Sequence, residues 1–401
     1  MAWFGRRTEI GVIAPFWSLS AAGFAATAIA FGPARMGFGL FVPEFRSEFG
    51  MSTAAVGFVS SLGFLGFFIG LPTAQVLLAR WGPRQPVLTG MATATVGMLV
   101  VALATNLPVL AVGVFLAASS AGLAWTPFND AIHDRVRDGD RPSALSAVST
   151  GTAIGIAIAG IAALTMVLGG LSWRLSWVTF AVVAAIALFG NWAAFRATNP
   201  DPRRPRKREW GEVVQAAAMP LLSVGFVFGT TSAIYIAFAA DHAVAAGGVS
   251  GAPVAATPAL LYLFYGFCGL AGLWTGRLRN MIDLCALVRF LMLSAALSAV
   301  LIAVAPDSWP GLVLSAGLQG VHVMMTSAVL AFWSERLFPS SPSLGFTGVL
   351  VAVAAGNMAG PVAAGFVSDV VGTEAMFIGA AALPAVTALL LHERYVRERP
   401  A

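Results

Sequence analysis

The stretch Asn199–Trp210, NPDPRRPRKREW, divides the chain into two similar parts. It holds three prolines and five basic residues, and this composition excludes a membrane-spanning helix. On each side of it lie six apolar runs long enough to cross a bilayer core, which requires roughly 20 residues. We therefore expect a cytoplasmic linker over residues 199–212 that joins an N-terminal six-helix bundle, residues 1–198, to a C-terminal six-helix bundle, residues 213–401.

The twelve apolar runs predict an all-α membrane protein. Apolar residues make up 58% of the 401 residues and charged ones only 10%, whereas ordinary soluble domains carry about 25% charged residues. The unbroken apolar length indicates helices, because a barrel strand has only about ten residues of alternating polarity. The predicted spans are residues 14–42, 53–78, 86–105, 109–129, 144–168, 174–195, 213–240, 257–276, 284–305, 310–333, 345–367 and 374–392.

The basic residues predict the orientation of the spans. With both termini in the cytoplasm, all but three of the 23 Lys and Arg residues fall at cytoplasmic span ends or loops. The exceptions are Arg46 and Arg174 on the external side and Arg35 inside the first span. This asymmetry follows the positive-inside rule, so cytoplasmic termini are expected. The same distribution argues against a nucleic-acid-binding surface as the meaning of the net charge of +5.

Glycine spacing indicates that the two halves are structural copies. Three glycines of the fifth span recur 205 residues later in the eleventh, and two of the second span recur 203 residues later in the eighth. FGPAR, Phe31–Arg35, in the first span corresponds to FGTTS, Phe228–Ser232, in the seventh. Such symmetry is typical of transporters that rock two bundles around a midplane site. The glycines are Gly151, Gly155, Gly160, Gly356, Gly360 and Gly365, and Gly63, Gly66, Gly266 and Gly269.

Twelve spans, a basic central linker and paired halves resemble the major facilitator superfamily over essentially the whole chain. The loop after the second span, ARWGPRQ (Ala79–Gln85), is similar to the superfamily's D-R-x-G-R-R/K signature, with matches at Arg80, Gly82 and Arg84. Ala79 stands where the superfamily usually has an aspartate, which weakens the charge interaction at this gating loop. The resemblance implies two six-helix bundles around a central cavity that the first span lines.

Two further segments resemble one group within the superfamily. RMGFGLFVPEF, Arg35–Phe45, and AAGNMAGPVAAG, Ala354–Gly365, are similar to the YbfB/YjiJ-like proteins, whose first span carries R-F-x-Y-G-x-x-x-P. This resemblance implies a multi-pass protein of the bacterial inner (plasma) membrane.

Arg35 is the leading candidate for substrate binding. It lies about seven residues, or roughly 10 Å, from the external end of the first span. A charge at this depth costs several kcal/mol unless it faces a water-filled cavity or a partner. All 18 carboxylates fall at span ends or in loops, so a ligand is expected to supply the negative charge. A guanidinium binds a carboxylate through two parallel hydrogen bonds, which predicts a small organic anion, a monocarboxylate with an apolar body. Snorkelling toward the headgroups is the alternative.

Other polar residues at mid-depth are expected to complete the site. His322 is the one histidine near the midpoint of a predicted span, and imidazole titrates near neutral pH, so proton coupling through His322 or Arg35 is expected. Gln319 lies one turn away on the same face, and Asn357 lies at the midpoint of the eleventh span. Each has a structural alternative, because polar side chains also hydrogen-bond between packed helices.

Tyrosine, serine and phenylalanine side chains extend this candidate site. Tyr235 and Tyr265 offer hydroxyl groups to a ligand, although tyrosine is also common at membrane interfaces. Ser232 is the repeat counterpart of Arg35, so the positive charge belongs to one half only, which favours a single anionic group. Phe31 and Phe38 lie at helical spacing from Arg35 and are expected to form an apolar wall, with ordinary packing as the alternative.

The sequence predicts a transporter and not an enzyme. It contains no P-loop, H-E-x-x-H, C-x-x-C or G-x-S-x-G motif, and no cofactor or metal ion is expected. The expected function is proton-coupled secondary transport by alternating access, with the anion, protons and membrane lipids as partners and a monomer as the working unit. Proton-coupled drug or metabolite efflux is the alternative, although Ala118 stands where such exporters usually have an arginine. A non-transporting receptor would need a signalling domain, and the loops are too short for one.

Overall fold

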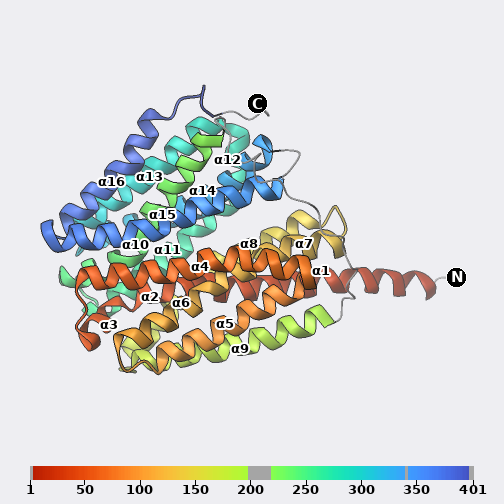
Figure 1. The fold of residues 1–401 in the computed structure, drawn as a ribbon, viewed down its shortest axis with the longest axis horizontal. Helices are drawn as coiled ribbons and strands as arrows, with labels where there is room; N and C mark the ends of the chain where they lie inside the picture. The colour runs from red at the N-terminus through yellow and green to blue at the C-terminus, as the bar shows by residue number, and fades with distance from the viewer. Residues whose placement is uncertain (1–2, 197–217, 339–341, 397–401) are drawn as a thin grey trace. The chain divides into compact units, whose positions relative to one another are not determined.

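The computed structural model describes residues 3–196, 218–338 and 342–396, so the predicted linker at 199–212 lies outside the described residues. Every regular element in the described ranges is a helix (Figure 1). Up to residue 196 the helices are α1 (Trp3–Ile29), the π-helical turn η1 (Ala30–Ala34), α2 (Arg35–Leu40), α3 (Val42–Phe49), α4 (Thr53–Trp81), α5 (Arg84–Ala102), α6 (Leu107–Ala124), α7 (Thr126–Arg135), α8 (Arg141–Leu168) and α9 (Trp173–Arg196).

The helices after residue 217 continue the same pattern of long apolar segments. They are α10 (Met219–Ala245), the 3-10 turn η4 (Val254–Ala256), α11 (Thr257–Gly269), the 3-10 turn η5 (Leu270–Trp274), α12 (Thr275–Met281), α13 (Leu284–Val304), α14 (Trp309–Leu337), α15 (Pro342–Val371) and α16 (Thr373–Leu390). Within the described residues, twelve segments are long and apolar enough to cross a membrane, which confirms the predicted number of spans and the all-α fold.

Several predicted spans are interrupted helices. The first contains the π-helical turn η1, the fourth is broken between α6 and α7, and the eighth passes through the 3-10 turn η5. Large apolar side chains such as Phe189 and Val370, which are 69% and 83% exposed, cover outer helix surfaces. This distribution suits helices whose outer faces contact lipid, since only the inner faces are packed against protein.

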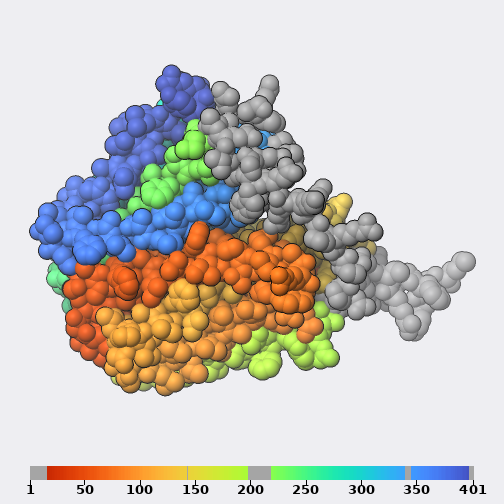
Figure 2. Space-filling view, viewed as in Figure 1, coloured from red at the N-terminus to blue at the C-terminus, as the bar shows by residue number. Residues whose placement is uncertain are grey.

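The described residues form two compact units. The first holds residues up to 37, 65–156 and 172–196, and the second holds residues 38–64, 157–171 and the described residues from 218 onward. In the first unit α5 packs against both α6 and α9, and in the second α13 packs against α14 and α16 (Figure 1). In the space-filling view the side chains of α5 and α6 form one continuous surface (Figure 2).

Glycines bring two helices of the first unit into backbone contact. Gly155 of α8 lies against the backbone of Ala28 in α1, and Gly151 lies against the Phe24 carbonyl group and the Thr27 side chain. A β-carbon at either glycine would overlap the facing helix, so the close approach depends on the missing side chain.

The second unit contains a similar contact at the counterpart glycines. Gly356 of α15 lies against Phe226 and Thr230 of α10, and Gly360 lies against Thr230. Both units therefore use the counterpart glycines, but the facing residues Phe24 and Phe226 are offset by 202, whereas FGPAR and FGTTS are offset by 197. The glycines that recur in the sequence thus make close helix contacts in each unit.

Candidate functional site

The first span is interrupted directly before Arg35. The turn η1 contains Pro33, which has no N–H group to donate to the helix, and all five of its residues are buried. Gly32 lies against the backbone of Gly155 in α8, where a larger residue does not fit. The backbone N–H of Arg35 donates to the Gly32 carbonyl oxygen as α2 begins. Single π turns within long helices are frequent at functional sites, and this one lies directly before Arg35.

The guanidinium group of Arg35 lies against two aromatic rings. Its central carbon is 4.4 Å from the ring centre of Phe67 on α4 and 5.4 Å from that of Phe31 in η1. Both rings are buried, and they meet edge to face at 6.4 Å. Cation–π contacts of this kind stabilise a cation in apolar surroundings by about 0.5–2 kcal/mol. Sequence reasoning missed Phe67, because nothing distinguishes it among 28 phenylalanines.

A second helix interruption adjoins these rings. Trp125 separates α6 from α7, and its ring meets Phe31 edge to face at 5.5 Å. The hydroxyl group of Thr126 is buried and has no hydrogen-bond partner among the described residues. Discontinuous helices that meet within the membrane are a recurring way of building transporter binding sites. We refer to Phe31, Arg35, Phe67 and Trp125 together as the Arg35 site.

Phe38, the other phenylalanine of the predicted wall, belongs to a separate aromatic group. Its ring stacks on Phe45 of α3 with ring centres 5.6 Å apart. The group continues from Phe45 to Phe41 and Phe49. Phe38 falls in the second compact unit, whereas Phe31 falls in the first.

The predicted gating loop is a short helix-to-helix turn. Gly82 ends α4 with φ of 74°, a left-handed conformation that favours glycine, and its N–H donates to the Leu78 carbonyl oxygen at 3.0 Å. Arg80 is exposed on the last turn of α4, and Arg84 begins α5. The glycine therefore makes the sharp turn, and the two arginines flank it.

Four polar side chains follow one buried face of α14: Ser315, Gln319, His322 and Thr326. The ring Nδ1 of His322 is 2.9 Å from the carbonyl oxygen of Leu291 on α13 and 3.3 Å from the Thr326 hydroxyl group. When Nδ1 carries the proton and donates to that carbonyl, Nε2 is left as an acceptor. Nε2 is buried and has no hydrogen-bond partner among the described residues.

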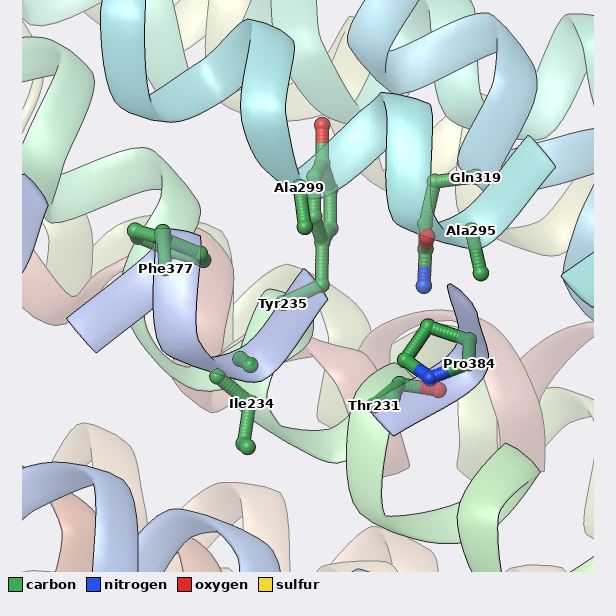
Figure 3. Close-up of a pocket in the computed structure, with 9 residues that line it drawn as sticks. Thr231, Ile234, Tyr235, Ala295, Ala299, Gln319, Phe377 and Pro384 are labelled. Carbon is green, nitrogen blue, oxygen red and sulfur yellow. The ribbon is translucent and has the colours of Figure 1, made fainter. Parts of the chain in front are cut away.

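Tyr235 and Gln319 line a small cavity in the second unit (Figure 3). The cavity measures about 10 Å³, which is room for roughly one water molecule. The Gln319 amide nitrogen points toward Thr231 and Pro384 and has no hydrogen-bond partner among the described residues. The Tyr235 hydroxyl group points away from them and shares a hydrogen bond of 2.9 Å with Ser315. The other lining residues are Ile234, Ala295, Ala299, Phe377 and Ala380.

The remaining predicted site residues are also buried in the second unit. The ring of Tyr265 lies 6.4 Å from that of Tyr235, so these two are brought together. Ser232 on α10 is 5% exposed, and Asn357 on α15 is 1% exposed. The structure thus assembles Tyr235, Tyr265 and Gln319 within one group of helices, with His322 one turn further along α14. It places Phe31 and Arg35 in the other unit.

Twelve apolar spans in the described residues, close glycine contacts in both units and a helix break before an arginine of the first span are features of a multi-pass membrane transporter. The sequence signature of the Major Facilitator Superfamily matches residues 24–282, more than half of the chain. The chain belongs to the Major Facilitator Superfamily. Its family and fold are those of transporters, which are not enzymes.

Solved structures with the same fold cover nearly the whole chain. The nucleoside transporter NupG superposes with a TM-score of 0.72 over 94% of this chain and 98% of its own, at 12% sequence identity. A POT family transporter in complex with 5-aminolevulinic acid gives a TM-score of 0.73 over 96% and 95% of the two chains, at 13% identity. At these identities the likeness shows the fold alone.

Two curated sequences match a shorter segment. Monocarboxylate transporter 13 from Bos taurus is 33% identical over 112 residues, and that from Rattus norvegicus is 34% identical over 112 residues. These segments are 28% of this chain and 26% of each relative, so the match spans about a quarter of either protein.

Proposed function

We propose that this chain is a secondary transporter of a small organic anion, a monocarboxylate with an apolar body, and that Arg35 binds the carboxylate. The observation that carries the proposal is the placement of a guanidinium group directly after a π turn and against Phe67 and Phe31. Ring contacts use the face of the guanidinium plane, whereas a carboxylate binds its N–H groups within that plane. Arg35 can therefore keep its contacts with the two rings while it binds a carboxylate through two hydrogen bonds.

The apolar surroundings of Arg35 favour one class of anion. Phe31, Phe67 and Trp125 offer aromatic surface for the ligand's body, and the chain places a single arginine there, which matches one carboxylate better than a phosphate. The segment similar to Monocarboxylate transporter 13 supports the same substrate class. Membership of the YbfB/YjiJ-like group, a bacterial inner-membrane location and cytoplasmic termini are part of this proposal.

Proton coupling and alternating access complete the proposed mechanism. The halves 1–198 and 213–401 rock about the substrate, and the loop with Arg80, Gly82 and Arg84 contributes to gating on the cytoplasmic side. His322 is the proposed proton carrier, because its Nδ1 is anchored to the Leu291 carbonyl group while Nε2 is available as an acceptor. Gln319, Tyr235, Tyr265, Ser232 and Asn357 are the proposed polar groups of the C-terminal half.

The proposal is tested by transport in liposomes with the purified full-length protein. We expect uptake of monocarboxylates such as benzoate or lactate that increases with an inward proton gradient. Arg35→Ala and Arg35→Lys should each reduce kcat/KM by about 100-fold or more, because lysine cannot reproduce the planar two-hydrogen-bond contact. Arg196→Ala is the matched control, since Arg196 also lies over an aromatic ring, Trp192 at 4.4 Å, but at the end of α9.

Two outcomes would overturn this assignment. Normal monocarboxylate uptake by Arg35→Ala would remove Arg35 from the binding site. Proton-driven export of lipophilic cations, with no binding of carboxylates in a thermal-shift panel, would replace anion transport by drug or metabolite efflux.

A further inference from the structure

Residues 38–64 belong to the N-terminal half of the sequence but pack with the C-terminal half. They comprise the end of the first span, α3 and the first part of α4, and they fall in the second compact unit together with α10 and α15. Residues 157–171, at the end of α8, fall in the same unit. In the orientation proposed above, all these segments lie at the external ends of their spans. Segments of both sequence halves are therefore joined at this end within one compact unit.

The contact of residues 38–64 is close enough for backbone to meet backbone. Gly39 of α2 lies against the Ile236 carbonyl group of α10, and Gly57 of α4 lies against the Pro361 carbonyl group of α15. A β-carbon at either glycine would overlap the facing helix, so the packed arrangement depends on the missing side chains. This packing involves no charged group, so any electrostatic control of the contact has to come from other residues.

Two carboxylates of the C-terminal half bind the polar part of the same segment. Asp241 of α10 forms an ion pair with Arg46 of α3. The Nε of Arg46 also donates to the Met51 carbonyl oxygen at 3.1 Å, which fixes the direction of the guanidinium group. Asp369 of α15 accepts a hydrogen bond of 3.2 Å from the backbone N–H of Ala54, at the start of α4, where the N–H groups of a helix favour an anion. Each carboxylate therefore faces a positive or partly positive group of residues 46–54.

The ion pair is strong enough to favour the contact and weak enough to break. The side chains of Arg46 and Asp241 are 33% and 14% exposed, so water reaches both. Partly exposed ion pairs change an equilibrium by up to about fivefold, and dissolved salt weakens them. Such an interaction can bias a contact toward the packed arrangement without preventing its release in each transport cycle.

We propose that Asp241 and Asp369 form an electrostatic clamp that keeps the external end of the spans closed, and that the transporter opens to this side when residues 38–64 leave α10 and α15. The clamp consists of Asp241 with Arg46 and of Asp369 with the start of α4. The inference rests on alternating access in the proposed function, but it concerns closure of the contact and holds for any substrate.

Each partner of the clamp can be changed separately. Asp241→Asn and Arg46→Gln remove one charge each, and each should lower the ratio of packed to separated protein by up to about fivefold. Asp369→Asn should have a smaller effect, because the amide oxygen still accepts from the Ala54 N–H. The charge swap Arg46→Asp/Asp241→Arg should recover most of the loss. Asp307→Asn is the matched control, since Asp307 is exposed in the turn between α13 and α14.

The test measures the distance between α3 and the loop after α10 by pulsed electron paramagnetic resonance, on the full-length protein in lipid nanodiscs without substrate. Spin labels are placed at Ser47→Cys and Ser250→Cys, both exposed positions, with Cys268 and Cys285 replaced by serine. Gly57→Leu provides the reference for separation, because its side chain would overlap the backbone of α15. Each protein is measured at about 0.05 M and about 0.5 M salt, which shortens the Debye length about threefold.

We expect a short distance in the parent protein and in Asp307→Asn, and an added longer population in Asp241→Asn and Arg46→Gln. Salt should increase the longer population in the parent but not in Asp241→Asn. Recovery of the short distance in the charge swap would show that the single variants are folded and that the attraction between opposite charges matters.

Three results would overturn the proposal. If Gly57→Leu lengthens the distance but neither neutralised variant does, packing alone closes this end. If the charge swap stays separated, attraction between the two charges is not the cause. If Gly57→Leu keeps the short distance, residues 38–64 do not separate from the C-terminal helices. Because no substrate is present, an error in the proposed substrate class would appear only in the uptake assay and would leave these distances unchanged.

Discussion

The first span and its repeat counterpart α10 share a packing contact but differ at the residues available for binding. Both lie against a pair of glycines on the partner helix. In the first span, FGPAR forms a π turn that ends at Arg35. In α10, FGTTS continues as a regular helix, and the hydroxyl groups of Thr230 and Thr231 donate to carbonyl oxygens one turn earlier, each at 2.9 Å. Packing is therefore common to both halves, whereas the charge and the helix interruption belong to one.

The largest effect is expected from moving the charge between the two helices. Arg35→Ser should lower kcat/KM for the transported anion by about 100-fold or more, about 2.7 kcal/mol of transition-state stabilisation. Adding Ser232→Arg should not restore transport, because α10 has neither the π turn nor the paired rings that hold Arg35. Initial rates of uptake into proteoliposomes measure both variants.

The double variant should also be less stable than Arg35→Ser alone, because Ser232 is only 5% exposed and an arginine there buries a charge. Its melting temperature in detergent measures this loss. Recovery of uptake in Arg35→Ser/Ser232→Arg would show that the two halves are interchangeable at this position and would contradict the comparison.

A smaller effect, on stability, is expected from adding a β-carbon at the glycines that contact a neighbouring helix. Gly155→Ala should lower stability by about 1–3 kcal/mol, because the new β-carbon overlaps the backbone of Ala28. Gly360→Ala should cost less, since its nearest contacts, with Thr230 and the flexible Ile234 side chain, are longer. Thermal unfolding of the purified variants ranks them.

Gly190 on α9 is the matched control for these substitutions. Nothing lies within 4 Å of a β-carbon at this position, so Gly190→Ala should leave the melting temperature unchanged or raise it slightly. Equal losses at Gly155 and Gly190 would show that close packing does not explain the cost at Gly155, because a β-carbon at Gly190 meets no neighbour.

Removal of the ring beside Arg35 should have a moderate effect on substrate affinity. Phe67→Leu keeps an apolar side chain but removes the contact at 4.4 Å, so we expect KM to rise by about 3- to 30-fold, which corresponds to about 0.5–2 kcal/mol. The turnover number should change less than KM, because the guanidinium group itself remains. Phe195→Leu, which removes a ring 5.8 Å from Arg135, is the control. The same KM change in both variants would argue against a special role for Phe67.

Hydropathy and charge are enough to predict the fold. The twelve spans can be predicted from the length of the apolar runs. The close helix contacts can be predicted from the recurring glycines, because both signals lie in the local sequence. The span limits differ where helices change type: the predicted single helix at residues 14–42 contains η1, and the fourth span continues through α7 to Arg135. Pro33 and Pro127 mark these interruptions in the sequence, but proline alone does not tell a π turn from a kink.

The candidate site is only partly predictable, because its contacts come from different spans. Depth within the first span singles out Arg35, but its neighbours Phe67 and Trp125 come from the second and fourth spans and carry no local signal. Sequence position groups Glu44 with the other carboxylates at span ends, where solvent is the usual environment. In the structure its Oε2 atom is buried with no hydrogen-bond partner among the described residues, which the sequence of α3 alone does not reveal.

The smallest expected effect separates a structural role for Gln319 from a role in transport. Its amide nitrogen has no hydrogen-bond partner among the described residues, so Gln319→Leu removes an unsatisfied donor beside the small cavity and should change stability by no more than about 1 kcal/mol. Ser315→Ala on the same face loses hydrogen bonds to Tyr235 and Ser298 and should be destabilised by about 1 kcal/mol, which makes it the control. Melting temperature and uptake are measured together for each variant. Normal stability with impaired uptake in Gln319→Leu would place this side chain on the transport pathway. Normal uptake would limit its role to packing.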